Sequence, residues 1–144
     1  MDKYLEDFKS ALKKENMKFT NQRYAIFKLL NNNSGHYDCD RIISYLKKNK
    51  KFNVSRATVY RTLDLLVKYN FADKMILDDG IARYESKVNR KHHDHMICIE
   101  TGKILEFRSD EIESIQEKIA KDMGYEIVKH VHQLFVKKIK WNQY

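Results

Sequence analysis

The order in which helical and strand-like patterns follow one another in the first 86 residues most constrains the fold. Apolar side chains recur at helical spacing in four successive segments that begin near residues 3, 20, 38 and 55. Two strand-like runs follow, 71–77 and 81–85, on either side of Asp78-Asp79-Gly80. Because Asp-Gly is a strong hairpin signal, the pattern predicts a winged helix-turn-helix.

The boundaries of these helices must be read from capping residues, because the chain has no proline and only four glycines. Thr20 is a good N-cap for the second helix, which we expect to end in the Asn-Asn-Asn-Ser-Gly run at 31–35. Asp38 or Asp40 can cap the third helix, and Ser55 can cap the fourth.

The fourth helix, expected to end near Tyr69, has two chemically different faces. Its apolar stripe consists of Val59, Leu63, Leu66 and Val67. The other face carries cations, a hydroxyl and a phenol: Arg56, Thr58, Tyr60, Arg61, Asp64 and Lys68. We therefore interpret this helix as a candidate recognition helix, although each of these side chains could also be ordinary surface.

The rest of the chain predicts a second, smaller module with the order β-β-α-β. Asp110 and Glu113 resemble a capping box for its helix. A module this small gains from burial against a partner, so we infer a dimerisation domain. The expected strands are 95–99, 103–107 and 125–139, the helix ends near 123, and the α+β chain divides into a DNA-binding domain at 1–86, a hinge at 87–91 and a dimerisation domain at 92–144.

The positive charge is concentrated in the first part of the chain. The formal charge is +8 overall; residues 1–91 hold 20 Lys/Arg and 11 Asp/Glu, a net of +9, and residues 92–144 hold 8 and 9, a net of −1. A cationic module suggests a polyanionic partner, either nucleic acid or a membrane surface, although a lysine-rich solubilising surface is an equal alternative. With no apolar run near the ~20 residues of a membrane span, we expect a cytoplasmic protein with no membrane partner.

The densest polar cluster is His92-His93-Asp94-His95, at the start of a predicted strand. Alternation along a strand sends His93 and His95 to one face and His92 and Asp94 to the other, so one segment can supply two ligand sets. Imidazoles and carboxylates suit divalent metals such as Zn(II), Fe(II) or Mn(II). The alternative is a solvated histidine-rich loop; further candidate ligands are His36, Glu85, Glu106, Glu113, His130 and His132.

Three stretches together resemble the ferric uptake regulator family of metal-responsive repressors. They are Ser55-Arg56-Ala57-Thr58-Val59-Tyr60-Arg61-Thr62-Leu63, His92-His93-Asp94-His95-Met96-Ile97-Cys98 and Thr101-Gly102-Lys103-Ile104-Leu105-Glu106-Phe107, with Tyr84-Glu85 between the first two. The resemblance extends in order from about Met17 to Val136.

The resemblance implies particular roles for particular residues. A regulatory metal between the two domains matches His36, Glu85, His93, His95 and Glu106. A second metal site in the dimerisation domain matches His92, Asp94, Glu113 and His130. DNA contacts fall on Tyr60 and Arg61, with Lys18 reaching toward the backbone or minor groove and Ser55, Arg56 and Thr58 beside them.

The sequence departs from many family members in its cysteines. Only Cys39 and Cys98 are present, so the four-thiolate structural zinc of those members cannot form, and we interpret Cys98 as a small buried strand residue. Peroxide-sensing members tend to carry Asp where this chain has Glu85 and Glu106, so the two glutamates favour iron-type sensing. We expect Fe(II) in vivo, with Zn(II) or Mn(II) as alternatives.

Together with the sequence pattern, the resemblance implies a transcriptional repressor whose metal-bound homodimer binds a palindromic double-stranded DNA operator. A peroxide-sensing or zinc- or manganese-sensing member of the same family is an alternative. Two other classes stay open: a metallo-hydrolase, disfavoured because the sequence has no HExxH motif or nucleophile elbow, and a winged-helix binder whose histidines hold no metal.

Overall fold

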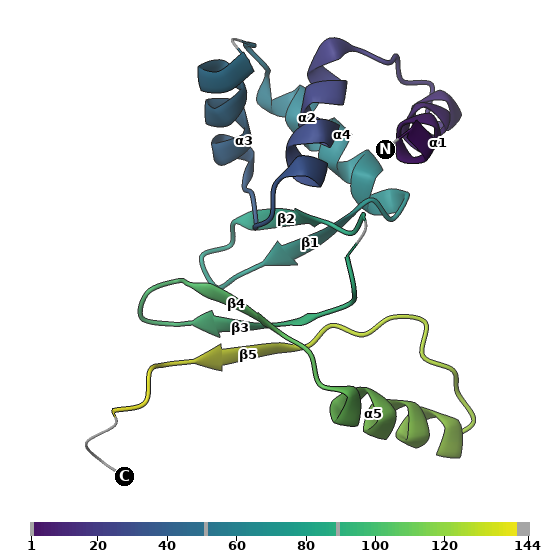
Figure 1. Cartoon of the computed structure of the whole chain (residues 1–144), viewed down its shortest axis with the longest axis vertical. Helices are drawn as coiled ribbons and strands as arrows, with labels where there is room; N and C mark the ends of the chain where they lie inside the picture. The colour runs from purple at the N-terminus through teal and green to yellow at the C-terminus, as the bar shows by residue number, and fades with distance from the viewer. Residues whose placement is uncertain (1, 51, 89, 141–144) are drawn as a thin grey trace. The chain divides into compact units, whose positions relative to one another are not determined.

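The computed structural model describes residues 2–50, 52–88 and 90–140 and confirms the α+β fold class (Figure 1). The chain divides into two compact units, Met1–Arg90 and Lys91–Tyr144. Within the predicted hinge at 87–91, Asn89 lies outside the described residues. In the part of the chain that the structure describes, no helix is both long and apolar enough to cross a membrane.

The first unit contains a helical layer and a two-stranded wing, in the order expected for a winged helix-turn-helix (Figure 1). Its helices are α1 (Asp2–Lys14), α2 (Asn21–Asn32), α3 (Cys39–Tyr45) and α4 (Arg56–Lys68), with a π-helical turn η1 (Leu46–Lys50) after α3. Its strands are β1 (Ala72–Ile76) and β2 (Ala82–Ser86), which pair antiparallel.

The predicted caps start these helices. The side chains of Thr20, Asp38 and Ser55 each accept a hydrogen bond from the backbone N–H three residues later, at 2.7–3.2 Å. Each cap satisfies one of the N–H groups that a helix leaves unpaired at its start. Of the two aspartates that could have capped the third helix, Asp38 does so.

Aromatic and aliphatic side chains from α1, α2 and α4 form the core of the first unit. The ring of Phe8 stacks on Phe27 with centroids 4.4 Å apart and meets Phe71 edge-on. Three members of the predicted stripe of α4, at positions 59, 63 and 66, are fully buried. Val67, which was expected to be buried with them, is only half-buried. Thr62 is buried instead, and its hydroxyl donates a hydrogen bond of 2.7 Å to the Thr58 carbonyl.

The second unit contains a three-stranded sheet and one helix, with the predicted chain order β-β-α-β, so the helix lies between the second and third strands in the sequence (Figure 1). The elements are β3 (Asp94–Cys98), β4 (Ile104–Phe107), α5 (Asp110–Asp122) and β5 (Gln133–Val136). The strand order is β4-β3-β5; β4 is antiparallel to β3, and β5 is parallel to it.

Two boundaries in this unit differ from the prediction. The N-cap of α5 is Ser109, which accepts a hydrogen bond from the Ile112 N–H. The capping box predicted from Asp110 and Glu113 is therefore wrong, because the third residue after the actual N-cap is Ile112, which has no carboxylate. The long strand expected at 125–139 is wrong. Only four residues pair with β3, because β3 is itself five residues long and a strand extends only where a partner offers backbone groups. His130 and His132 therefore lie in the connection before β5.

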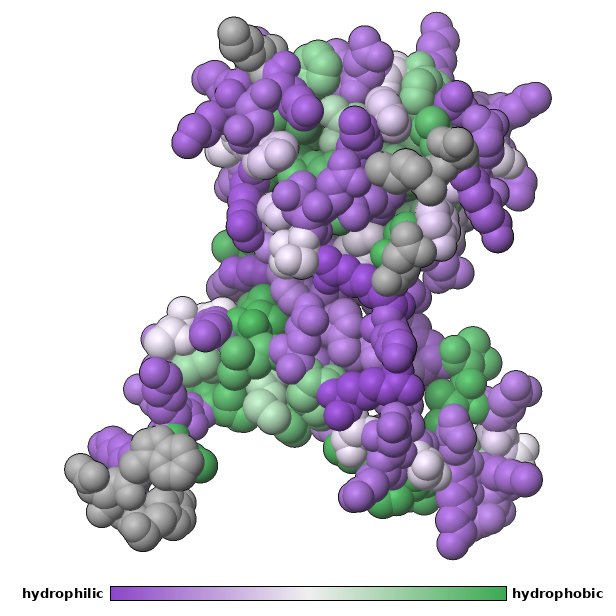
Figure 2. Space-filling model, in the orientation of Figure 1, coloured by the Kyte–Doolittle hydropathy of each residue, from purple (hydrophilic) through white to green (hydrophobic). Residues whose placement is uncertain are grey.

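The second unit exposes much of its apolar surface. None of the described side chains of α5 is buried, and the helix stands apart from the sheet in Figure 1. Figure 2 shows apolar patches over this unit, where the first unit presents a mainly hydrophilic face. The exposed apolar side chains are Ile99, Leu105, Ile115, Ile119, Met123, Tyr125, Ile127, Val128, Val131, Leu134, Phe135 and Ile139.

Candidate metal centres and nucleic-acid surface

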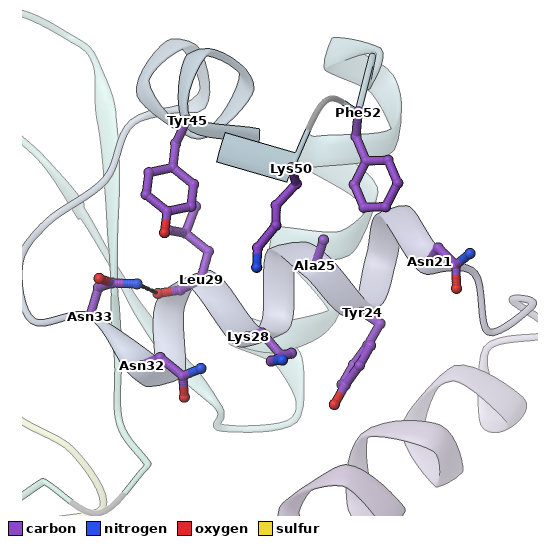
Figure 3. Close-up of a pocket in the computed structure, with 10 residues that line it drawn as sticks. All are labelled: Asn21, Tyr24, Ala25, Lys28, Leu29, Asn32, Asn33, Tyr45, Lys50 and Phe52. Carbon is purple, nitrogen blue, oxygen red and sulfur yellow. Dashed lines mark hydrogen bonds between the residues drawn. The ribbon is translucent and has the colours of Figure 1, made fainter. Parts of the chain in front are cut away.

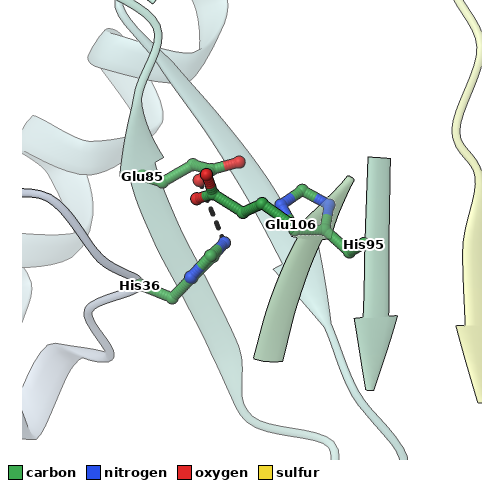
Figure 4. A group of neighbouring side chains, drawn as sticks. All are labelled: His36, Glu85, His95 and Glu106. Carbon is green, nitrogen blue, oxygen red and sulfur yellow. Dashed lines mark ion pairs between the residues drawn. The ribbon is translucent and has the colours of Figure 1, made fainter. Parts of the chain in front are cut away.

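A buried imidazole–carboxylate pair lies in the first unit, at the end of the wing. Tyr37 and Tyr84 form an isolated antiparallel bridge through two backbone hydrogen bonds of 2.9 Å. This bridge places His36 opposite Glu85, and the His36 Nε2 atom lies 2.9 Å from Oε2 of Glu85 (Figure 4). The side chains are 9% and 3% exposed. The long-range bridge thus brings together two residues that were predicted to share one metal.

A second imidazole–carboxylate group lies on the β3–β4 hairpin of the second unit. The register of the hairpin pairs His95 with Glu106, and both side chains are drawn in Figure 4. His93, which precedes β3, lies 3.4 Å from Glu106 through its Nε2 atom, and its ring is 4.9 Å from that of His95. Each of the two units therefore contributes its own part of the predicted regulatory set.

The four residues predicted to form a second metal site lie close together within the second unit. His130 Nε2 lies 2.8 Å from His92 Nε2 and 2.9 Å from Oδ1 of Asp94. Oε1 of Glu113, from the first turn of α5, lies 3.5 Å from each of the two imidazole nitrogens. Donor atoms of all four side chains lie within 4.8 Å of one another.

These four residues fit a divalent metal. Two nitrogen and two oxygen donors are a set that Zn(II) accepts, and Fe(II) and Mn(II) also bind such ligands. Asp94 is only 2% exposed, and a carboxylate is seldom buried without a cation or a full set of hydrogen bonds. Oδ2 of Asp94 and Oε1 of Glu113 are buried and have no hydrogen-bond partner among the described residues. A cation would compensate the burial of these oxygens.

The alternation predicted for the His-His-Asp-His run is present. His92 approaches Asp94, at 3.3 Å between Nε2 and Oδ1, and His93 packs against His95. His132 was considered only as a further candidate ligand, and it is not part of either cluster found among the described residues. Its Nδ1 atom nevertheless lies 4.0 Å from Oδ2 of Asp94.

The candidate DNA surface lies on α4. Tyr60 is 42% exposed and Arg61 is exposed beside it. Arg56 forms an ion pair with Asp40, which raises the pKa of the guanidinium and provides it with a protein partner. The remaining predicted contacts also have local roles: the Ser55 hydroxyl caps α4 and bonds to the Thr58 hydroxyl, and Lys18 accepts a hydrogen bond from Arg23 through its carbonyl.

The two cysteines lie in different units and in different environments. Burial raises the pKa of the Cys39 thiol in α3, and hydrogen bonding with the Thr101 hydroxyl lowers the pKa of the Cys98 thiol in β3. Cys98 is 8% exposed, as expected for a small strand residue facing the interior.

The first unit also contains a cavity of about 350 Å³ beside α2 (Figure 3). Aromatic, amide and lysine side chains line it, and the lining includes no carboxylate, histidine or cysteine. Its lining therefore has no typical metal ligands. The lining residues are Asn21, Tyr24, Ala25, Lys28, Leu29, Asn32, Asn33, Tyr45, Lys50 and Phe52.

A winged helix-turn-helix unit, followed by a unit with a histidine–carboxylate cluster, defines a metal-binding transcription regulator. Residues 14–135 match the Ferric uptake regulator family. The chain belongs to this family, whose members are transcription regulators and not enzymes. Family membership decides against the metallo-hydrolase alternative.

Relatives in sequence and in structure agree with this assignment. The ferric uptake regulation protein of Campylobacter jejuni is 38% identical over 135 residues, which cover 93% of this chain and 85% of the relative. The ferric uptake regulator of Helicobacter pylori superposes with a TM-score of 0.83 at 31% identity, covering 99% of this chain and 93% of the other. The Pseudomonas aeruginosa regulator, solved with manganese, gives 0.78 at 32% identity, covering 91% and 97%.

Proposed function

We propose that this protein is a metal-dependent transcriptional repressor whose metal-bound homodimer binds a palindromic DNA operator. The proposal rests on how the candidate metal ligands are distributed between the two units. A buried imidazole–carboxylate pair belongs to the unit with the recognition helix, and a second histidine–carboxylate group belongs to the other unit.

The regulatory site is proposed to take ligands from both units. Its residues are His36 and Glu85 from the first unit and His93, His95 and Glu106 from the second. These side chains can share one cation only in a restricted set of orientations of the two units. Binding therefore stabilises those orientations in proportion to the difference in affinity between them and all others.

The second site is proposed to stabilise the second unit. Its residues are His92, Asp94, Glu113 and His130. Asp94 begins β3 and His92 lies two residues before it, Glu113 is in α5, and His130 is in the connection before β5. A shared cation would therefore link α5, which has no buried side chain, to the sheet. Such a site adds directly to the stability of the folded unit.

We propose Fe(II) as the physiological metal, with Mn(II) and Zn(II) as alternatives. The donor sets contain only imidazole and carboxylate groups, which suit all three ions. The Pseudomonas aeruginosa relative was solved with manganese, and the Helicobacter pylori relative is described with three functional metal binding sites. Because Cys39 and Cys98 are the only two cysteines of the sequence, a four-thiolate zinc is not part of this proposal.

The partner that covers the apolar surface of the second unit is proposed to be a second copy of the chain. Ile115 and Ile119 lie on α5 and are 59% and 56% exposed, and Met123 follows them at 71%. Exposed apolar side chains that are clustered on one element in this way mark an interaction site. A two-fold dimer also accounts for a palindromic operator, because half-sites mirror the symmetry of the protein.

The DNA-reading surface is proposed to be α4 with its flanking cations. Tyr60 and Thr58 can contact base edges, thymine methyl groups in particular, while Arg61 and Arg56 contact phosphates or bases. Lys18, before α2, is proposed to reach toward the DNA backbone or minor groove, and Ser55, at the start of α4, is proposed to lie among the DNA-contacting residues. The net charge of +9 in residues 1–91 supports a polyanionic partner.

The function can be tested by selecting duplexes with a random centre on the full-length protein, once with Mn(II) and once with a chelator. We expect enrichment of a palindromic sequence only with the metal, and abolition of its binding by the paired change His93→Ala and His95→Ala. Changing Tyr60 and Arg61 to Ala should remove specific binding and leave metal stoichiometry unchanged. Enrichment that is equal with the chelator would overturn the proposal.

A further inference from the structure

We propose that His132 is a positioning residue for the second metal site and that it orients the carboxylate of Asp94 without binding the metal itself. This inference rests on the proposed function, because it assumes that His92, Asp94, Glu113 and His130 hold a cation. It assigns a role to a histidine that lies outside the donor clusters found among the described residues.

The two oxygens of Asp94 face different partners. Oδ1 lies 2.9 Å from Nε2 of His130 and 3.3 Å from Nε2 of His92. Oδ2 instead lies 4.0 Å from Nδ1 of His132. One oxygen is therefore directed to the ligand cluster, and the other is left for His132.

The two atoms that face each other are each otherwise unsatisfied. Oδ2 of Asp94 and Nδ1 of His132 are both buried, and neither has a hydrogen-bond partner within the described ranges. A carboxylate oxygen only accepts, and a neutral imidazole carries one N–H that can be placed on Nδ1. Closing the gap from 4.0 Å to a hydrogen bond takes a movement of about 1 Å.

The surroundings of His132 hold its ring beside Asp94. The His132 carbonyl accepts a hydrogen bond of 3.2 Å from the His95 N–H, which fixes the backbone against β3. The imidazole packs edge-on against Phe107, with ring centroids 5.6 Å apart at 83°. Phe107 is the register partner of Asp94 across the β3–β4 hairpin, so the same pair of strands positions both Asp94 and the ring.

A hydrogen bond from Nδ1 to Oδ2 would leave Oδ1 as the single donor atom of Asp94. Ligating carboxylates are commonly held in this way by groups around the ligands, and loss of such a group typically lowers metal affinity by ~10–100-fold. Without His132, Oδ2 is free to turn toward the cation, and a bidentate carboxylate favours higher coordination numbers than the tetrahedral geometry that Zn(II) prefers.

The test uses the full-length chain with His93→Ala and His95→Ala, so that Zn(II) and Co(II) titrations report on the second site. His132→Leu removes the N–H donor, and His132→Asn keeps one close to the position of Nδ1. We expect Leu to lower Zn(II) affinity by ~10–100-fold and to weaken the Co(II) d–d absorption that marks four-coordination. Asn should restore most of both; His132→Ala provides the same comparison if the Leu variant does not fold.

Unchanged affinity and Co(II) absorption in His132→Leu would overturn the inference. An Asn variant as weak as the Leu variant would do so too, since it would show that the ring volume or a direct imidazole ligand matters instead of the donated hydrogen bond. Failure of the parent chain to bind Zn(II) at all would overturn the second site of the proposed function, and the inference with it, and is distinguished because it appears before His132 is changed.

Discussion

The Nε2 atom of His36 lies 2.9 Å from Oε2 of Glu85, and neither side chain is more than 9% exposed. The bridge between Tyr37 and Tyr84 holds the two residues opposite each other. The charge of a buried carboxylate is costly without compensation, and the His36 imidazole contributes part of that compensation. This pair is therefore the part of the proposed regulatory site that the first unit prepares.

Glu85→Gln keeps the volume of the side chain and removes its charge. We expect metal affinity at the regulatory site to fall by at least about tenfold, since changing groups that only support metal ligands already costs 10–100-fold. Calorimetric titration of Mn(II) into the full-length chain measures the change. Glu100→Gln, at an exposed turn of the second unit, is the matched control. If the Glu85→Gln and Glu100→Gln variants bind Mn(II) with equal affinity, Glu85 is not a ligand of the regulatory site.

Arg61→Ala should weaken DNA binding through phosphate contact. Each lost contact lowers the slope of log K against log salt concentration by about 1. The measurement is fluorescence anisotropy with a labelled duplex and Mn(II) over a series of salt concentrations. Lys118→Ala removes an exposed cation from α5 in the second unit and should leave the slope unchanged. If both variants reduce the slope equally, the attraction arises from net charge and not from α4.

The first unit could be predicted almost completely because its signals are local. Thr20, Ser55 and the Asp78-Asp79-Gly80 turn each act within a few residues, so caps and the hairpin followed from the sequence. Asp38 and Asp40 could not be told apart, because both are good caps and only the geometry of the helix start selects one.

The second unit was harder to predict, because the extent of its strands depends on pairing between residues far apart in the sequence. The apolar run after Tyr125 has a strand-like composition, yet only Gln133–Val136 pairs with β3. The composition of a segment does not show how many residues of a neighbouring strand are available to pair with it. The role we propose for His132 was missed for a similar reason: its relation to Asp94 spans 38 residues and depends on the parallel pairing of β3 and β5. A histidine two positions from His130 was the available signal.

We expect the folded protein to lose stability at high pH because Tyr84 is buried. Burial raises its pKa from 10 to about 12, and the side chain is 1% exposed. Because the folded state favours the protonated phenol, this contribution is complete below pH 10 and is lost as the pH rises toward 12. A shift of this size corresponds to about 2–3 kcal/mol. Urea unfolding at pH 9 and pH 11.5 measures the difference.

Tyr84→Phe should remove that part of the alkaline dependence, because the ring is kept and the ionisable group is lost. Tyr125→Phe, at a residue 73% exposed in the second unit, should leave the dependence as in the parent chain. A Tyr84→Phe variant that loses as much stability between the two pH values as the parent would assign the alkaline transition to other groups.

Phe8→Ala should be the most damaging single truncation among the aromatic residues of the first unit. Phe8 is fully buried, stacks on Phe27 and meets Phe71 edge-on, so its removal leaves a cavity between α1 and α2. Truncations of this kind cost about 3–5 kcal/mol. Phe19 also contacts Phe8 but is 43% exposed, so Phe19→Ala should cost clearly less. Urea unfolding followed by far-UV circular dichroism compares the two. A loss for Phe8→Ala as small as that for Phe19→Ala would mean that α1 contributes little to the core, and that α2, α4 and the wing fold without it.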